Sequence, residues 1–320
     1  MLEYNKYSFN IIMDRKVVFR SLPSFIFRNN LGFHLKKITC VFENHECSDC
    51  MLKAACVYSS VFETPVDKNN VVLKGRNNAP HPYMVCAGAP ASEPSDRLIL
   101  DIVLIGEAVR YFPYILLAML NIGKSGIFKD RIRFEIDDIY CRGESIMDKS
   151  NYSCKNLSPS VWDYCDIDGA AAHSIQGTEK QGIRRETVRI NFETQVRIQR
   201  NGKYLRIITY KDFLYASARR VILLESFFGN GNPDLGGKLG ECFIESVAEE
   251  KEFEADLKWT DYQRYSARQK QSMLLGGLIG TALVAGSFSE AELSLLRAAE
   301  LFGVGKNVSF GLGKIKAEVI

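Results

Sequence analysis

The stretch Gly303-Val-Gly-Lys-Asn-Val-Ser-Phe-Gly-Leu-Gly-Lys-Ile-Lys-Ala-Glu318 lies just before the end of the chain and is rich in glycine. Glycine has no Cβ, so its backbone reaches positive φ and can approach a ligand closely. A bend that exposes successive N–H groups beside Lys306 suits a phosphate chain. It is not a P-loop, because GxxxxGK[ST] followed by a helix is absent here. The alternative is a flexible turn before an alternating terminal segment, Lys314 to Val319.

The composition of the chain is that of an ordinary globular protein. It has 320 residues, 46% hydrophobic and 25% charged, which is enough for two domains with substantial cores. The formal net charge is only +3, but it is unevenly spread. Arg184 to Arg220 holds ten Lys/Arg against three Asp/Glu, and Glu241 to Asp261 holds eight acids against two bases. The basic band indicates one surface that faces a polyanion, and the acidic stretch indicates a solvated face.

No segment indicates secretion or a membrane. The N-terminus lacks the basic start and apolar core of a signal peptide. Gln271 to Ser289 carries no charge, but its four glycines favour a buried strand with a bend over a transmembrane helix. Nine cysteines without a signal sequence favour a reducing compartment. We therefore expect a cytoplasmic protein without a membrane partner.

Hydrophobic periodicity predicts an α+β fold with three parts: a first domain at 1–141, a polar linker or insertion at 142–183, and a second domain at 184–320. In the first domain we expect four strands, at Tyr7–Met13, Lys16–Phe19, Leu98–Arg110 and Arg131–Tyr140. We also expect one helix that Ser21 caps and that ends near Ile38, and a second helix that follows Arg110 and runs through Leu120. In the second we expect a strand Thr187–Ile198, a hairpin turn Arg200–Lys203, and helices Asp212–Phe228 and Glu290–Phe302, the last capped by Ser289. The recurrence fits two βαββαβ-like units.

A cysteine-rich loop at 40–56 is the strongest metal signal. Its thiols, Cys40, Cys47, Cys50 and Cys56, fall within seventeen residues, and the two-residue gap between Cys47 and Cys50 lets both reach one ion. Zinc is favoured over an iron–sulfur cluster, and His45 could replace one ligand. Such a site would brace the loop rather than catalyse. The alternative is four buried or incidental thiols.

Of the four histidines, His34, His45, His81 and His173, His34 is placed best for chemistry. It falls at the edge of a helical stripe that contains Leu31 and Leu35, with Lys37 one turn away on the polar side. Packing can hold an imidazole there beside a cation, and proton transfer near neutral pH needs such a group. The structural alternative is a packed histidine without a catalytic role.

A second pattern suits RNA. Trp259-Thr-Asp-Tyr-Gln-Arg-Tyr-Ser-Ala-Arg268 interleaves aromatic and basic residues, so it can stack bases and bind phosphates. Ordinary surface packing would produce the same pattern.

Several segments together resemble one family. They are Arg28-Asn-Asn-Leu-Gly-Phe-His34, the block from Cys47 to Tyr58, Phe62-Glu-Thr-Pro65, His81-Pro-Tyr83, Phe192-Glu-Thr-Gln-Val-Arg197, Trp259 to Gln269, Leu275-Gly-Gly-Leu-Ile-Gly280, and Gly303 to Gly313. This set resembles the CRISPR-associated endoribonucleases of Cas family six, in the RAMP superfamily, which process precursor crRNA. Gln195 and Val196 stand where that family pattern leads us to expect a Pro-Leu-like pair.

The resemblance implies two tandem ferredoxin-like, RRM-related domains and a C-terminal glycine-rich loop that contacts RNA. It implies metal-independent cleavage of repeat RNA, without a catalytic cofactor or a small-molecule substrate, and partners among other CRISPR effector subunits. On this chain His34 would be the base or acid and Lys37, or Lys36, the charge donor. The residues expected to bind RNA are Gly303, Gly305, Lys306, Gly311, Gly313, Arg197, Arg264 and Arg268.

Two other hypotheses remain open at this point. One is a non-catalytic RAMP subunit that holds processed crRNA. The other is a zinc-braced protein that binds DNA or another protein.

Overall fold

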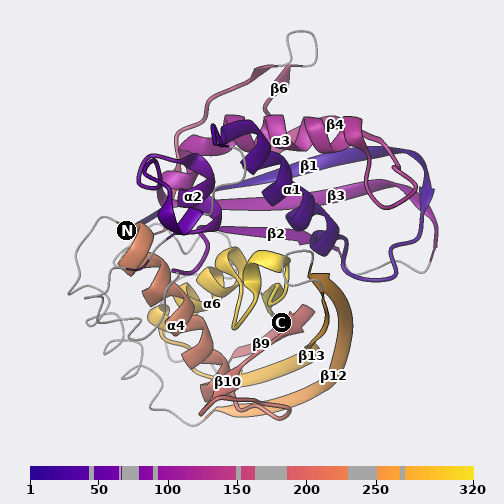
Figure 1. Ribbon diagram of the computed structural model, residues 1–320. Coiled ribbons are helices and arrows are strands. Elements are labelled where there is room, and N and C mark those ends of the chain that lie inside the picture. Colours follow the sequence, from indigo (N-terminus) through magenta and orange to yellow (C-terminus); the bar gives the residue numbers. More distant parts are fainter. Residues whose placement is uncertain are drawn as a thin grey trace. The chain divides into compact units, whose positions relative to one another are not determined.

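The computed structural model describes residues 1–42, 47–64, 66, 79–88, 93–148, 153–162, 186–229, 251–266 and 271–320 (Figure 1). The chain divides into two compact units. The N-terminal unit comprises Leu2–Val161 with Phe227–Gly229, and the C-terminal unit comprises Met1, Trp162–Ser226 and Asn230–Ile320.

The N-terminal unit runs strand, helix, strand, strand, helix, strand. These elements are β1 (Leu2–Val17), α1 (Pro23–Thr39), β2 (Tyr83–Ala87), β3 (Ser95–Ile105), α3 (Phe112–Ser125) and β4 (Phe134–Cys141). The strands form an antiparallel sheet in the order β2-β3-β1-β4-β5. The shorter elements are α2 (Val57–Phe62), β5 (Glu144–Ser145), β6 (Met147–Asp148), β7 (Ser153–Cys154) and β8 (Ser160–Trp162).

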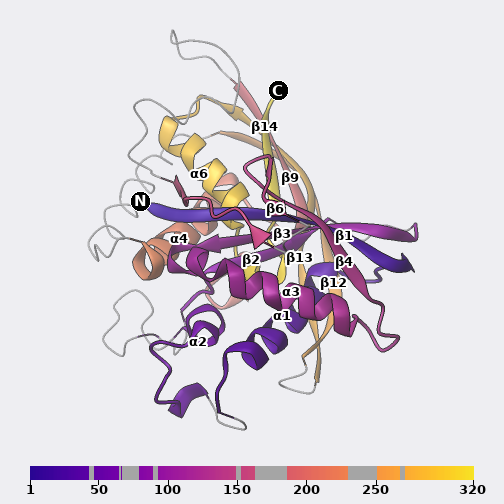
Figure 2. The ribbon, with the colours of Figure 1, turned by 90° about the horizontal axis from the view of Figure 1, so that it is seen from above.

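Helices α1 and α3 cover one face of this sheet (Figures 1 and 2). Tyr7 of β1 stacks on Phe112 at the start of α3, with ring centroids 3.9 Å apart. Phe27 of α1 meets Phe134 of β4 at 5.5 Å. Full burial of each such ring stabilises the fold by about 1.5–3 kcal/mol. These contacts fix α1, and with it His34, on a rigid sheet.

Three sequence expectations for this unit were wrong in detail. Strand β1 is continuous where we expected two strands, because its charged stretch keeps pairing: the backbone N–H of Asp14 donates to the carbonyl of Arg133 at 3.0 Å. Helix α1 has Leu22 rather than Ser21 at its N-cap, without a side-chain cap, since Pro23 alone sets its start. Strand β3 ends at Ile105, where a 3-10 turn begins.

The C-terminal unit repeats the same order of elements. They are β9 (Glu186–Val196), α4 (Tyr210–Phe228), β12 (Glu252–Ser266), β13 (Gln271–Gly286), α6 (Glu290–Phe302) and β14 (Ile315–Val319), with the hairpin β10 (Gln199–Arg200) and β11 (Lys203–Tyr204) between β9 and α4. The sheet order is β12-β13-β9-β14, again antiparallel. By position it matches the β2-β3-β1-β4 order of the first sheet, which confirms two βαββαβ units.

The uncharged segment that could have suggested a membrane span is strand β13, as expected. The register of its pairing with β9 shifts between Leu278 and Gly280, and Gly280 has a φ of 134°. This irregularity is the bend that the sequence predicted. Figure 1 shows β12 and β13 curving together. No helix in the described ranges is both long and apolar enough to span a membrane.

Helix α6 begins and ends where the sequence predicted. Ser289 caps it in a capping box with Glu292, and the helix ends at Phe302. The Glu292 carboxylate also lies 3.0 Å from the Lys251 ammonium, and both side chains are 3% exposed. Removing one partner of this buried pair would leave an uncompensated charge, so loss of either side chain alone should destabilise the start of α6.

Candidate functional site

His34 lies on the inner side of α1 and is 8% exposed. Leu31 and Leu35, which flank it on the helix surface, are buried in the core, and the Phe33 ring meets the imidazole edge-on at 5.3 Å. Lys37, one turn later, is exposed. The expected position at the edge of the core stripe is confirmed, although the imidazole is more deeply buried than the sequence suggested.

The surroundings of His34 favour its neutral form. Burial lowers the pKa of His34 below its ordinary value, and the nearby Lys37 cation lowers it further. The imidazole is therefore neutral at pH 7 and able to accept a proton. This is the protonation state that a general base needs.

The opposite edge of α1 packs against α2 in a cluster that the sequence analysis missed. Gly32 lets the helices meet, since a Cβ there would lie 2.9 Å from the Phe62 ring. The Arg28 guanidinium lies 5.1 Å from the Phe62 centroid, and the Lys36 ammonium lies 5.7 Å from that of Tyr58. Arg28, Gly32 and Lys36 are spaced four residues apart and so lie on one side of the helix. This spacing was the sequence signal that could have predicted the contact with α2. Of the two lysines, Lys36 lies over Tyr58, whereas Lys37 lies near enough to His34 to affect its pKa.

The glycine-rich loop 303–313 is tied to the end of β9 by its own backbone. The N–H of Lys306 donates to the Arg197 carbonyl, the N–H of Gly313 to the Gln195 carbonyl, and the N–H of Val304 to the Gly313 carbonyl, each at 2.9 Å. The expectation that this loop presents successive N–H groups to a ligand was wrong for these three groups, because they bond inside the protein.

Two glycines explain why the loop can dock so closely. Gly305 and Gly313 have φ of 82° and 77°. A Cβ at Gly305 would lie 2.4 Å from the Arg197 carbonyl oxygen, and one at Gly313 would lie 2.1 Å from that of Val304. These positions therefore need glycine for backbone packing, and the resulting loop is preorganised rather than flexible.

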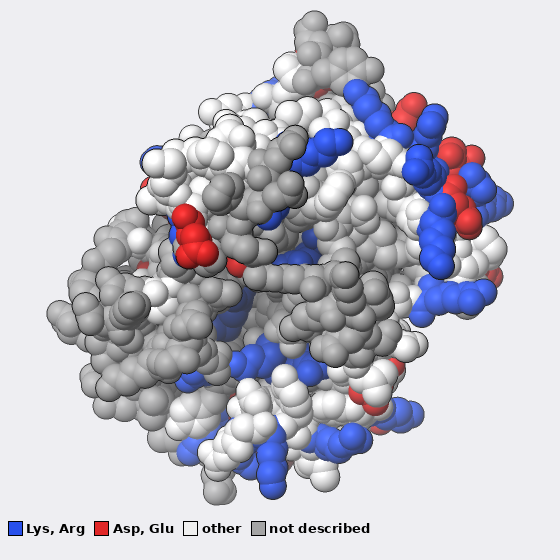
Figure 3. Space-filling model, in the orientation of Figure 1, with Lys and Arg blue, Asp and Glu red and all other residues white. Residues whose placement is uncertain are grey.

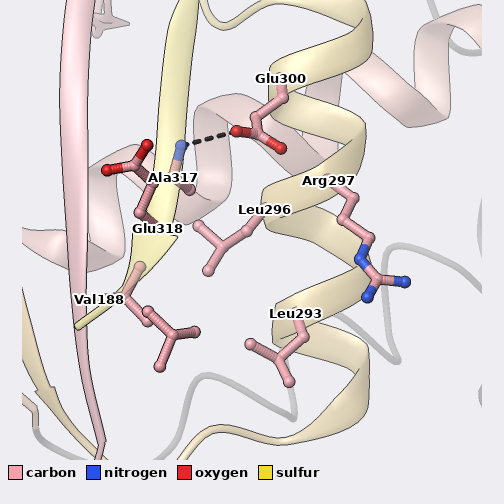
Figure 4. Close-up of a pocket in the computed structure, with 8 residues that line it drawn as sticks. Val188, Leu293, Leu296, Arg297, Glu300, Ala317 and Glu318 are labelled. Carbon is pink, nitrogen blue, oxygen red and sulfur yellow. Dashed lines mark hydrogen bonds between the residues drawn. The ribbon is translucent and has the colours of Figure 1, made fainter. Parts of the chain in front are cut away.

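Both ends of the loop are anchored as well. The buried Arg220 of α4 donates from Nε to the Phe302 carbonyl at 3.2 Å, immediately before Gly303. On the other side, the Glu300 carboxylate accepts the Ala317 N–H at 2.7 Å (Figure 4). The hollow in Figure 4 between α6 and β14 is lined by apolar side chains such as Leu293 and Leu296 together with the charged Arg297, Glu300 and Glu318.

The structure brings part of the expected RNA-binding set together. Arg197 and Lys306 lie at the junction of β9 and the loop; Arg197 is 5% exposed and Lys306 is half-buried. The Arg264 side chain and Arg268 lie outside the described residues. Figure 3 shows Lys and Arg side chains gathered over the region of β9 and β10. His34 belongs to the other unit.

The four cysteines of the 40–56 loop are free thiols and partly buried. Burial raises the pKa of Cys47 above its ordinary value, and the nearby Lys36 cation acts in the opposite direction. Within the described ranges, however, no three His, Cys, Asp or Glu side chains are arranged to hold a metal ion. His45 and His173 lie outside those ranges, and zinc binding stays a prediction.

Comparison with protein families decides the relationship of this chain. Residues 190–315, which include most of β9, the hairpin of β10 and β11 and the glycine-rich loop, match the family "CRISPR-associated endoribonuclease Cas6". This part of the chain is therefore similar to the Cas6 endoribonucleases. Residues 2–159 match a separate family described as an N-terminal domain.

Similar proteins cover nearly the whole chain. An uncharacterized protein of Archaeoglobus fulgidus is 24% identical over 304 residues, which is 91% of each chain. A product complex of a Thermus thermophilus Cas6 superposes with a TM-score of 0.55 at 13% identity, over 99% of this chain and 100% of that one. A partial Cas6-RT-Cas1–Cas2 complex superposes with a TM-score of 0.57 at 12% identity, over 100% of this chain and 46% of that one. The mixed α/β fold with antiparallel sheets is therefore that of Cas6 proteins.

Proposed function

We propose that this protein is an endoribonuclease that cuts CRISPR repeat RNA within precursor crRNA. The observation that carries the proposal is His34: a buried imidazole with a lowered pKa beside a cation, in a chain with a Cas6 domain. A histidine that serves packing alone has no need of a neighbouring cation, whereas a base for a phosphate substrate benefits from one.

In this mechanism the 2′-hydroxyl upstream of the scissile phosphate attacks the phosphorus in line. His34 accepts the hydroxyl proton, a new 2′-O–P bond forms, and the bond from phosphorus to the 5′-oxygen breaks. The leaving 5′-oxygen takes up a proton from solvent water, and the products carry a 2′,3′-cyclic phosphate and a 5′-hydroxyl. Lys37 stabilises the charge that builds on the phosphorane-like state. These steps need acid–base groups and positive charge, and no metal ion takes part in them.

We infer further that each unit is a ferredoxin-like, RRM-related domain. The support is the shared βαββαβ order and the shared strand order of the two sheets. RRM-type sheets bind single-stranded RNA by stacking and hydrogen bonding. Since one similar structure is a Cas6-RT-Cas1–Cas2 complex, association with other CRISPR proteins belongs to the same proposal.

The test uses repeat RNA, labelled at its 5′ end, from the CRISPR array of the host genome. Incubated in EDTA, the protein should cut this RNA once per repeat and leave a cyclic phosphate. A matched RNA with a 2′-deoxy nucleotide just upstream of the scissile phosphate should bind equally well and stay intact. Cutting of the deoxy substrate would disprove the 2′-hydroxyl mechanism. Tight binding without cutting of either RNA would make the protein a non-catalytic crRNA-binding subunit.

We also propose that Cys40, Cys47, Cys50 and Cys56 hold a structural zinc ion. The supporting observations are the sequence spacing and the presence of four free, partly buried thiols. Metal analysis of the purified protein should find about one zinc per chain, and the double variant Cys47→Ser/Cys50→Ser should lose it. Zinc-free protein with unchanged thermal stability would refute the site.

A further inference from the structure

The hairpin between β9 and α4 concentrates positive charge. Residues 197–206 contain four Lys or Arg and no Asp or Glu. The two short strands β10 and β11 meet in a tight turn at Asn201 and Gly202, with φ of 51° and 79°. A two-stranded hairpin adds little to a hydrophobic core, and Lys203, Tyr204 and Arg206 are exposed.

Side chains of this hairpin form an alternating array with β12. The Arg197 guanidinium lies 4.3 Å from the Tyr204 ring centroid, and the Arg206 guanidinium lies 4.8 Å from that of Trp259. The two rings are 6.5 Å apart and inclined by 52°. Arginine planes and aromatic rings are the surfaces on which proteins stack unpaired bases. We call Arg197, Tyr204, Arg206 and Trp259 the stacking array.

Asp261 and two glycines of β13 position the side chains of the array. The Trp259 indole donates from Nε1 to the Asp261 carboxylate at 3.1 Å. It lies over Gly276 of β13, where an added Cβ would come within 2.5 Å of the indole nitrogen. The neighbouring Gly277 similarly leaves room for the Arg197 side chain, since a Cβ there would lie 3.0 Å from its Cγ. Each glycine thus leaves room for one member of the array, Gly276 for Trp259 and Gly277 for Arg197.

Arg197 shows that the array is incomplete in the protein alone. Its side chain is 5% exposed, yet its Nε and Nη1 donors have no acceptor in the described structure. A buried charged donor without an acceptor is costly, so an anionic acceptor is expected from outside the chain. Arg197 also adjoins the glycine-rich loop through Lys306. A phosphate between nucleotides would satisfy it while an adjacent base meets Tyr204, which is 39% exposed.

We propose that the stacking array binds an unpaired segment of the RNA, with bases on Tyr204 and Trp259 and a phosphate on Arg197. This inference rests on the proposed function for its substrate and adds the part of the RNA that is held. Base-paired RNA fits less well, because its bases already stack on one another. The competing explanation is that the arginines only fasten the hairpin to β12.

The experiment measures binding of the full chain to fluorescein-labelled repeat RNA that a 2′-deoxy substitution makes uncleavable. Tyr204→Ala should weaken binding about 5- to 100-fold, and Tyr204→Phe should restore it, because stacking needs the ring and not the hydroxyl. Tyr215→Ala is the matched control: Tyr215 is 41% exposed on α4, with the Lys211 ammonium 5.8 Å from its ring. This control should bind like the unaltered protein. The same losses should be much smaller on a fully paired RNA duplex.

A direct readout of stacking comes from Trp259, one of two tryptophans in the chain. RNA should quench its fluorescence in the unaltered protein, and Trp259→Phe should abolish this quenching. Unchanged binding by Tyr204→Ala in a folded protein, or equal losses on single strand and duplex, would overturn the stacking array. If the protein binds RNA through Tyr204 but never cuts it, only the proposed nuclease activity fails. A chain that binds no RNA overturns both.

Discussion

The two units share one frame and differ in the connection after their second helix. In the N-terminal unit α3 ends on Gly126, with φ 80° and ψ 155° and its N–H bonded to the Ile122 carbonyl at 2.8 Å. In the C-terminal unit α6 ends on Gly303, with φ 74° and ψ 167° and its N–H bonded to the Ala299 carbonyl at 2.9 Å. The helix ends are nearly the same, but the connections to the last strand are not.

In the N-terminal unit the chain returns to β4 by a short connection, closed by a bridge between Ile127 and Ile132. In the C-terminal unit it passes through the glycine-rich loop, which bonds to β9 and carries Lys306. Since the short connection already completes a βαββαβ unit, the longer one is not a requirement of the fold. We propose that the two units have different roles, with the first supplying His34 for proton transfer and the second holding the RNA.

The largest effect is expected when the proposed catalytic histidine is removed: cleavage should be lost and RNA binding kept. His34→Ala should lower the single-turnover cleavage rate about 10²- to 10⁴-fold, the usual contribution of general acid–base catalysis. Affinity for uncleavable repeat RNA should stay within about twofold, because binding is assigned to the other unit. Cleavage at the unaltered rate would remove His34 from the mechanism, and a parallel loss of affinity would refute the division of labour.

The pH profile defines the role of His34 more closely. Burial and Lys37 lower its pKa, so it is neutral above that value and protonated below it. If it is the base, the rate should fall by about tenfold per pH unit as the pH drops through and below this pKa. Lys37→Gln removes the cation and should move the fall to higher pH. A rate that rises on acidification would make His34 the general acid instead.

Whether the glycine-rich loop needs its close backbone packing can be tested by adding one methyl group at Gly313. Gly313→Ala forces φ of 77° on a side-chain residue and places its Cβ against the Val304 carbonyl. We expect the free energy of unfolding to fall by about 1–3 kcal/mol, with weaker RNA binding. Gly88→Ala is the control in the N-terminal unit, since nothing lies within 4 Å of its added Cβ. Equal urea midpoints for the two variants would mean that the loop tolerates rearrangement.

The smallest effect is expected from surface charge. Lys306→Glu should weaken binding of all RNA sequences alike, by about tenfold or less, and should reduce the slope of log affinity against log salt by about one. Lys129→Glu makes the same change at an exposed position in the short connection of the N-terminal unit and should leave binding unaltered. Loss confined to one repeat sequence would show that Lys306 reads bases.

Local signals predicted much of this fold. Ser289 was predicted as the cap of a helix Glu290–Phe302, which are the bounds of α6, and Asn201-Gly202 predicted the hairpin turn. Helical spacing also placed His34 at the edge of the core. The inward bonding of the glycine-rich loop was missed, because it depends on Gln195 and Arg197, more than a hundred residues earlier in the chain. The contact between Arg206 and Trp259 was missed because it joins the hairpin to a later strand, and the contact between Arg197 and Tyr204 was missed because it depends on how the hairpin folds back.

The buried ion pair of Lys251 and Glu292 predicts how these two positions vary among homologous chains. Because either charge alone would be stranded in the interior, relatives that replace one residue by a neutral one should replace the other as well. The two positions, forty-one residues apart, are thus expected to covary in an alignment of homologues. Lineages in which both have become apolar should still retain a serine, threonine or aspartate where Ser289 caps the helix.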